Sequence, residues 1–147
     1  MNASWPKWIH ASLNKKIRTV VTAIPVYAET DAKPEGVSDR LEFSWVGPHI
    51  SEVSSGQYFL DITLVVLVTS IRTATNDYKV YIDQGYGQEA LPTCIPVYKY
   101  GAEIADDSSQ LGILVRKTPI EEFFIGHQDQ TNRIRQVGFT ANYRMDL

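Results

Sequence analysis

The chain has 147 residues, a formal net charge of −3 and a hydrophobic content of 44%. This length can bury a core without disulfides or metals, and the composition excludes a disordered chain. The weak acidity, with no segregated basic stripe, excludes a protein that grips phosphate backbones through clustered Lys and Arg. The one cysteine, Cys94, cannot form an internal disulfide, and we expect it to be a small core residue in a reducing compartment. We predict a single domain over residues 1–147.

An amphipathic helix is predicted near the start of the chain, over residues 5–21. The apolar residues that recur there at helical spacing are Ile9, Leu13, Ile17 and Val20. Trp5 and Trp8 cannot both lie on that stripe, so we expect them to contact a partner. No signal peptide precedes the helix, and the longest apolar run in the chain is too short to cross a bilayer, so we expect no membrane association.

A polar segment follows from Ala28 to Arg40, and it holds almost nothing to bury. Connections of this length are uncommon in compact domains unless they serve a function. We therefore predict a loop over residues 28–40 that is flexible or contacts a partner. Its acidic candidate contacts are Asp31, Glu35 and Asp39.

Two alternating segments predict a long β-hairpin. The first strand starts at Leu41, is interrupted at Gly47-Pro48 because proline cannot donate to a sheet ladder, and resumes near Ile50. After a turn at 54–56, the second strand covers 58–69, which spans about 40 Å at the usual strand rise. Because this is about twice a typical strand length, we expect the hairpin to reach beyond its own domain. The candidate contact residues on it are Glu52, Tyr58 and Phe59.

The second half of the chain predicts one more helix and several strands. The helix begins near Asn76 and ends before Pro92. Its residues at helical spacing are Tyr78, Tyr81, Ile82 and Gly85. The strands that follow are expected over 95–100, 111–117, 123–125 and 136–147. An acidic loop at 101–109 separates the first two of these strands, and it supplies the candidate contacts Asp106 and Asp107.

The strongest strand signal lies in residues 136–147, where the side chains alternate without a break. A period of two over this length is typical of a half-buried strand. Chain ends normally fray unless something holds them, so we expect a core strand here. The predicted fold is α+β: a mostly antiparallel β-sheet with a long β-hairpin, packed against two α-helices.

Residues typical of catalysis or metal binding form no recognisable constellation. His10, His49 and His127 have no His or Cys partner at metal-ligand spacing. Cys94, His127 and Asp129 can be written as a nucleophile, base and acid, but no glycine-supported nucleophile motif accompanies them. We therefore predict no catalytic, cofactor-binding or metal-binding residues, and a protein that is not an enzyme.

Six stretches, in order over most of the chain, carry a resemblance to a known family. They are Trp5–Ser12, Leu41–Pro48, Leu64–Val68, Ile95–Gly101, Asp106–Gly112 and Asn142–Leu147. Together they resemble small virion structural proteins of tailed bacteriophages, of the neck, head–tail joining or tail-completion type. The order of elements is similar to that of tail terminators, which pair an antiparallel sheet with two helices and assemble as hexameric rings.

The resemblance implies a non-enzymatic subunit of the head–tail junction: a tail terminator whose homohexameric ring caps the tail tube and docks to the head connector. Its partners would be other copies of itself, the tail tube protein, and a connector, adaptor or stopper protein of the head. Such a subunit is assembled in the host cytoplasm and is located in the virion. The mild negative charge suits a lumen that DNA passes without specific binding.

Two alternatives stay open. The first is a head-closure stopper or another neck ring protein, which sequence cannot separate from a terminator because the two differ in what they touch. The second comes from another class: a small α+β ligand-binding or hydrolytic domain with a pocket around His127, Asp129 and Cys94.

Overall fold

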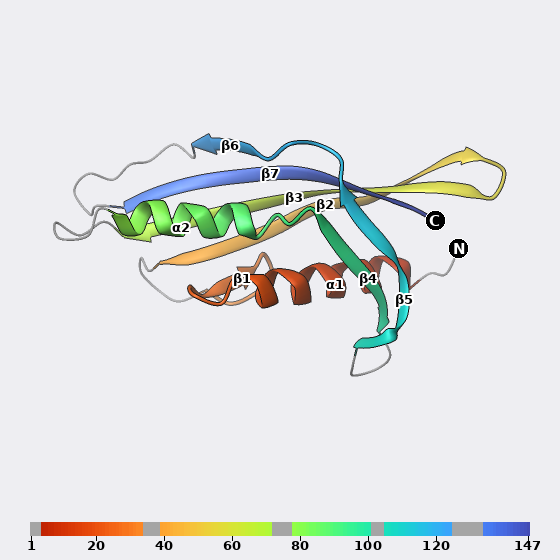
Figure 1. The fold of residues 1–147 in the computed structure, drawn as a ribbon, viewed down its shortest axis with the longest axis horizontal. Coiled ribbons are helices and arrows are strands. Elements are labelled where there is room, and N and C mark those ends of the chain that lie inside the picture. The colour runs from red at the N-terminus through yellow and green to blue at the C-terminus, as the bar shows by residue number, and fades with distance from the viewer. Residues whose placement is uncertain (1–3, 34–38, 72–77, 101–104, 125–133) are drawn as a thin grey trace.

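The computed structural model describes residues 4–33, 39–71, 78–100, 105–124 and 134–147. In these residues the chain forms two helices and seven strands (Figure 1). In chain order they are α1 Trp5–Val20, β1 Val26–Ala28, β2 Arg40–Ser54, β3 Gln57–Ile71, α2 Tyr78–Glu89, β4 Cys94–Tyr100, β5 Ala105–Arg116, β6 Glu121–Phe124 and β7 Ile134–Asp146. No described helix is both long and apolar enough to span a lipid bilayer.

The strands join one sheet in the order β1-β2-β3-β7-β5-β4, and β6 pairs with β7 beside this path. β2 and β3 form the predicted hairpin, and β7 runs antiparallel to β3. Strand alternation turns one set of β3 and β7 side chains into a common core. Its members from these strands are Leu60, Ile62, Leu64, Val66, Val68, Val137, Phe139, Ala141, Tyr143 and Met145. The predicted α+β fold, with two helices and a mostly antiparallel sheet, is confirmed.

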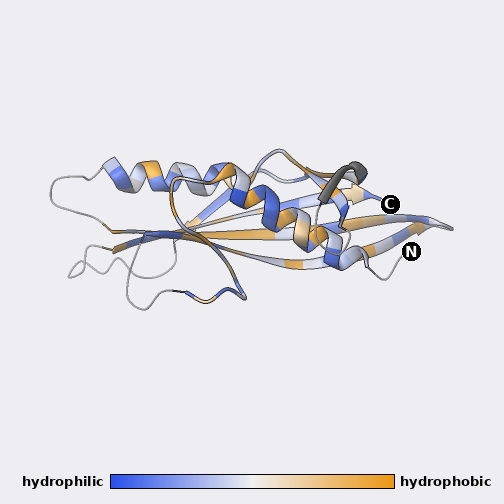
Figure 2. Cartoon of the chain, turned by 90° about the horizontal axis from the view of Figure 1, so that it is seen from below, coloured by the Kyte–Doolittle hydropathy of each residue, from blue (hydrophilic) through white to orange (hydrophobic). Residues whose placement is uncertain are grey.

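Both helices cover the same face of the sheet (Figure 2). The predicted first helix is confirmed, and its stripe of Ile9, Leu13 and Ile17 is fully buried against that face. α2 approaches the sheet through Gly87, where an added Cβ would lie 2.5 Å from the Phe139 ring. Only a residue without a side chain lets the helix backbone come this close.

β2 is continuous where the sequence predicted an interruption. The β2–β3 register shifts between Val46 and His49, and Gly47 has a φ of 107° at this point. The Gly47–Pro48 peptide is cis. Proline is tolerated in a strand at such a β-bulge, because the bulged residues leave the hydrogen-bond ladder. The predicted turn at the hairpin tip is confirmed, and Gly56 supplies its positive φ of 79°.

Strand β1 was missed by the sequence analysis. It pairs in parallel with β2, with Val26 opposite Leu41 and Ala28 opposite Phe43. Ala28, which was predicted to open a polar loop, is buried at the end of this strand. A three-residue strand has too few positions to show a period, so neighbouring β2 decides its conformation.

The β4–β5 hairpin diverges from the main sheet. In the described parts of the chain, β5 pairs with β7 only at Val115 and Arg116, while it pairs with β4 along most of its length. β5 also begins earlier than predicted, because Ala105 is paired with Tyr100. Residues 105–109 therefore belong to a strand, and the prediction of an acidic loop over these positions is wrong.

Candidate assembly surfaces

The tip of the β2–β3 hairpin extends past the strand that flanks it (Figure 1). β7 pairs with β3 as far as Phe59, and Leu147 N donates to the carbonyl oxygen of Tyr58 at 2.9 Å. Beyond this point β2 and β3 pair only with each other in the described chain. Glu52 and Val53 lie on this tip and are exposed. A ribbon that leaves its sheet offers another chain both a backbone edge and apolar side chains.

Tyr58 and Phe59, at the base of the tip, are half-buried. The guanidinium carbon of Arg144 lies 4.5 Å from the centre of the Phe59 ring, and Arg144 Nε donates to Asp61 Oδ1 at 2.9 Å. This hydrogen bond outweighs burial and holds the pKa of Asp61 below its ordinary value. Phe59 therefore already has a cation on its face, and the free surface of the hairpin lies further out.

Trp5 and Trp8, the predicted aromatic contacts, pack on each other with ring centres 5.8 Å apart. Trp8 is only 6% exposed, and Lys99 Nζ lies 5.7 Å from the centre of its ring. Trp5 is half-buried against the core. These contacts fasten the start of α1 to β4, so most of the tryptophan surface is used within the chain.

Asp31, one of the acidic candidates, closes a turn after β1. Its Oδ2 accepts from Ala28 N at 2.9 Å and forms an ion pair with Arg18. The hydrogen bond from Ala28, which outweighs burial, and the nearby Arg18 hold the pKa of Asp31 below its ordinary value. Asp31 therefore has a local structural role. Glu35, the next candidate, lies outside the described residues.

Asp39 belongs to a polar network that ties α2 to β2 and β3. Its Oδ1 accepts from Ile71 N at 2.7 Å, and its Oδ2 lies 2.5 Å from Lys79 Nζ. Lys79 Nζ also donates to Asp83 Oδ2 at 2.8 Å, and Ser70 Oγ donates to the same oxygen at 2.9 Å. Burial alone would lower the pKa of Lys79, but its hydrogen bonds to the two carboxylates raise that pKa overall.

The outer side of α2 is apolar and exposed. Tyr78, Tyr81 and Ile82 are 80%, 62% and 55% exposed, and we call them the α2 strip. On the opposite side of the helix, Asp83 is only 2% exposed. Helical spacing of apolar residues normally marks the side that packs on the core. α2 reverses this rule at these positions, since Asp83 is buried while Tyr78, Tyr81 and Ile82 are exposed. The guanidinium of Arg135 lies 5.5 Å from the centre of the Tyr81 ring.

A second apolar strip lies on the outer side of β5. Leu111, Ile113 and Val115 alternate with inward residues and are 38%, 44% and 51% exposed, and we call them the β5 strip. Cys94 is paired with Val115 and is also exposed, so the expectation of a core cysteine is wrong. Cross-strand partners share a face of a sheet, so Cys94 points outward with Val115.

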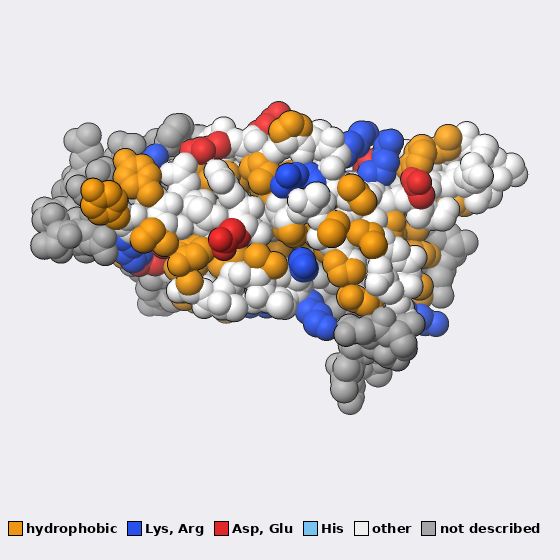
Figure 3. All heavy atoms as spheres, viewed as in Figure 1, with side chains coloured by type: hydrophobic (Ala, Val, Ile, Leu, Met, Phe, Trp, Pro, Cys, Tyr) orange, Lys and Arg blue, Asp and Glu red, His pale blue; other side chains and the backbone are white. Residues whose placement is uncertain are grey.

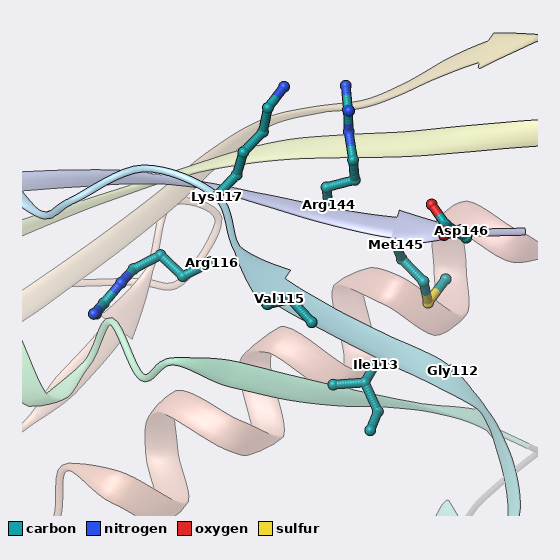
Figure 4. A pocket seen from close by; sticks show the side chains of 8 residues that line it. All are labelled: Gly112, Ile113, Val115, Arg116, Lys117, Arg144, Met145 and Asp146. Carbon is teal, nitrogen blue, oxygen red and sulfur yellow. The ribbon is translucent and has the colours of Figure 1, made fainter. Parts of the chain in front are cut away.

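An open groove of about 470 Å³ lies where β5 leaves β7 (Figure 4). The sticks in Figure 4 show Val115, Ile113 and Met145 on one side of it, and the long side chains of Lys117 and Arg144 extending together to the other. Its full lining is Gly112, Ile113, Val115, Arg116, Lys117, Arg144, Met145 and Asp146. Figure 3 shows hydrophobic side chains gathered over α2 and, separately, over β4 and β5 on the same face of the molecule.

The other predicted residues do not converge on a chemical site. The backbone of Asp106 and Asp107 lies within β5. His127 and Asp129 lie outside the described residues, so the alternative pocket around them has no described geometry. Among the residues that the structure does describe, no group of three His, Cys, Asp or Glu could hold a metal ion. The His10 ring packs edge-on against Trp45 at 4.6 Å between ring centres, and burial lowers its pKa.

Both apolar strips were missed as contact surfaces by sequence reasoning. For β5 a signal existed, because Leu111, Ile113 and Val115 alternate with Gly112, whose missing side chain makes room for Met145. For α2 the spacing predicted the helix, but it did not show which side of the helix would meet the sheet. A buried aspartate is rare unless it is paired, and Asp83 is paired both with Lys79 of its own helix and with Ser70 of β3.

Comparisons with known proteins identify no family. No protein-family model and no curated protein matches this chain. One similar solved structure, of a protein whose name states no function, has a TM-score of 0.50 and 17% sequence identity. The match covers 95% of this chain and 94% of that chain. Likeness at this identity shows a shared fold over nearly the whole length of both proteins, and nothing of their activity.

Proposed function

We propose that this chain is a structural, non-enzymatic subunit of the head–tail junction of a tailed bacteriophage. In this proposal it is a tail terminator that forms a ring of six, caps the tail tube and docks to the head connector. The observation that carries the proposal is the β2–β3 hairpin tip, which leaves its own sheet and exposes Glu52 and Val53. A ring subunit needs such a part, because a neighbour's sheet can pair with it.

Two further features support a role in assembly. Exposed apolar side chains gather in the α2 strip and the β5 strip, and contiguous apolar surface is typical of sites that bind other chains. The hairpin and these strips lie on different parts of the molecule, so contacts between copies can be heterologous. Heterologous contacts form a ring when the rotation between neighbours closes.

The proposal includes a lumen that DNA passes without being held. Its support is the formal net charge of −3, since fixed cations would bind the phosphate backbone. Nitrocellulose filter binding with duplex DNA measures this property at low salt. We expect weak retention that disappears at physiological salt, and tight, salt-resistant retention would contradict the lumen assignment.

The ring itself is tested with a charge placed on the hairpin tip. Val53→Asp puts a carboxylate where another copy would pack, while Thr22→Asp adds the same charge at an exposed position beyond the end of α1. Light scattering coupled to size exclusion should give a hexamer for the wild type and for Thr22→Asp, and smaller species for Val53→Asp. A wild-type chain that stays monomeric at all concentrations, and joins neither tails nor heads, contradicts the proposal.

The alternatives within the class differ in their partners. A tail terminator binds purified tail tubes, whereas a head-closure stopper binds DNA-filled heads that carry their connector. Mixing the ring with each and imaging the products by negative-stain microscopy assigns one of the two. We expect rings on the head-proximal ends of tail tubes.

A further inference from the structure

The groove between β5 and β7 has an open strand edge, and the hairpin tip has another. We propose that the tip of one copy adds a strand to the open edge of β5 in the next copy, inside this groove. The inference rests on the proposed ring, and it names the surface that receives the tip. Four features lead to it: the two open edges, the direction of the tip, the exposed apolar side chains and the charges.

The receiving edge belongs to β5. On one edge this strand pairs with β4. On the other edge it pairs with β7 only at Val115 and Arg116, so its backbone from Leu111 to Leu114 has no strand partner there among the described residues. This stretch is as long as a short strand. An edge of this kind accepts an added strand through main-chain hydrogen bonds.

The added strand comes from the outer edge of β2. On this edge, β1 pairs with β2 only from Leu41 to Phe43. The later segment from His49 to Ser54 pairs with β3 on one edge, and within the described parts of the chain it has no strand partner on the other. Its main-chain groups on that edge are therefore available to a second open edge.

The tip of a chain points away from the groove of the same chain. It runs outward past Leu147, whereas β5 turns away from this direction where it leaves β7 (Figure 1). The proposed contact therefore joins two copies. Each copy gives one tip and receives one, so the contact is heterologous, and it forms a ring when the rotation between neighbours closes.

The groove and the tip both expose apolar side chains. Ile113 and Val115 are exposed, and they lie with Met145 on one side of the groove (Figure 4). Val53 is the exposed apolar residue of the tip. In the proposed contact Val53 packs against Ile113 and Val115, and the removal of these side chains from water favours association.

The charges of the groove and the tip are complementary. The charged residues that line the groove are three cations and one acid: Arg116, Lys117, Arg144 and Asp146. Lys117 extends beside Arg144, which is bonded to Asp61 (Figure 4). Even with Asp61 included, positive charge is in excess. Glu52 is the one charged residue in the tip, residues 50–58, so opposite charges meet in this pairing.

Chemical cross-linking tests the contact in the assembled protein. In a Cys94→Ser background, which removes the one native cysteine, Val53→Cys and Ile113→Cys place thiols on the two surfaces. A short bismaleimide should join copies into a covalent ladder up to the size of the ring on a denaturing gel. When the two cysteines are on separate chains that are mixed, the products should stop at a covalent dimer. Val53→Cys with Val46→Cys is the matched control. Val46 is 68% exposed on β2, outside the groove, and this variant should give no ladder.

A charge exchange tests the same pairing without cysteines. Glu52→Lys and Lys117→Glu should each raise the concentration at which the ring dissociates about tenfold, because each places like charges across the contact. The double variant restores opposite charges and should return to within about twofold of the wild type. Light scattering coupled to size exclusion, over a dilution series, measures all four proteins.

The outcomes separate this inference from the proposed function. The inference is overturned, and the ring stands, if a hexamer forms but the Val53→Cys/Ile113→Cys variant gives no ladder. The same holds if the double charge variant is no more stable than its singles. A ladder from a protein that joins neither tails nor heads supports the contact and overturns the phage assignment. A chain that stays monomeric at all concentrations overturns both.

Discussion

The two helices lie on the same face of the same sheet, yet they use their apolar residues in opposite ways. α1 buries its whole stripe, and Ile9, Leu13 and Ile17 have no exposed surface. α2 exposes its stripe and buries Asp83. α1 is therefore held by the hydrophobic effect, whereas α2 combines an ion-pair network with a close approach at Gly87 and with Tyr86, which packs against the core.

The difference shows that the spacing of apolar residues predicts a helix with an apolar side, but does not identify the surface on which that side packs. In α1 the contact is the chain's own core. In α2 the residues at the same spacing are exposed, while Asp83 on the opposite side of the helix is bonded to Ser70 of β3 and to Lys79. The apolar side of α2 therefore stays largely exposed, with the Arg135 guanidinium over the Tyr81 ring.

The largest expected effect comes from truncating the buried stripe. Leu13→Ala should lower the free energy of unfolding by about 3 kcal/mol, because it leaves a cavity beneath α1. The matched change on α2, Ile82→Ala, should cost less than about 0.5 kcal/mol, since this side chain is exposed. Urea unfolding followed by circular dichroism measures both. If the two variants lost the same free energy of unfolding, both helices would bury their apolar stripes to the same extent, and the contrast between α1 and α2 would be wrong.

Removing the charge from the buried network should have the next largest effect. Asp83→Asn leaves Lys79 with a weaker partner in a buried place, and we expect a loss of about 2 kcal/mol. In the Asp83→Asn/Lys79→Met double variant the two losses should not add, because both residues serve one interaction. Strict additivity, measured by the same urea unfolding, would show that the network does not hold α2.

The network also predicts a pH dependence. Because the folded state raises the pKa of Lys79, its stabilising effect is fully present below the unfolded value of about 10.4 and is lost as the pH rises through the folded pKa. The wild type should therefore lose stability at alkaline pH relative to Lys79→Met. Thermal unfolding at a series of alkaline pH values measures the stability of both proteins. If the melting temperatures of the wild type and Lys79→Met fell in parallel with pH, the predicted role of Lys79 would be wrong.

Two glycines in α2 allow a test in which matched substitutions should have opposite effects on stability. Gly87→Ala should destabilise by about 1–2 kcal/mol, because the new Cβ would lie 2.7 Å from Val68 Cγ2 and closer still to the Phe139 ring. Gly85→Ala should stabilise by about 0.5–1 kcal/mol, since nothing lies within 4 Å of its added Cβ and alanine favours the helix. Thermal melts of the two variants should move in opposite directions. If both melting temperatures moved in the same direction, the assignment of Gly87 to the side of α2 that faces the sheet would be wrong.

The smallest expected effect belongs to the surface ion pair at the base of the hairpin. Arg144→Leu should change the free energy of unfolding only slightly at neutral pH, because exposed ion pairs are screened by solvent. The pKa of Asp61 is depressed in the folded state, so its contribution is present above about pH 4 and is lost as the pH falls through the folded pKa. The difference in free energy of unfolding between the wild type and Arg144→Leu should therefore decrease in acid. If the difference did not change with pH, it would come from the lost contact between Arg144 and Phe59 and not from the ion pair.

Much of the fold could be predicted because its strongest signals are local. The alternation over residues 136–147 and 58–69 needs no information from elsewhere in the chain, and both strands form where expected. The first helix begins at Trp5 as predicted. Strand β1 could not be found in this way, because three residues show no period and their conformation comes from β2.

The candidate surfaces were less predictable, because exposure depends on distant partners. Asp31 and Asp39 look like free acids in the sequence, but Arg18, Lys79 and the backbone engage them in the fold. Cys94 looks like a core residue, yet the divergence of β4 and β5 from the main sheet turns its side of β4 to solvent. Propensity and period describe each segment alone, and burial is decided by which segments meet.

The place of β7 in the sheet has a consequence for biosynthesis. This strand comes after all the others in chain order, yet it lies between β3 and β5. A ribosome therefore releases the hairpin and both helices well before the segment that completes the sheet can pair with β3. Non-local pairing of this kind slows folding, and the edge of β3 stays unpaired on the nascent chain until β7, Ile134–Asp146, has been translated.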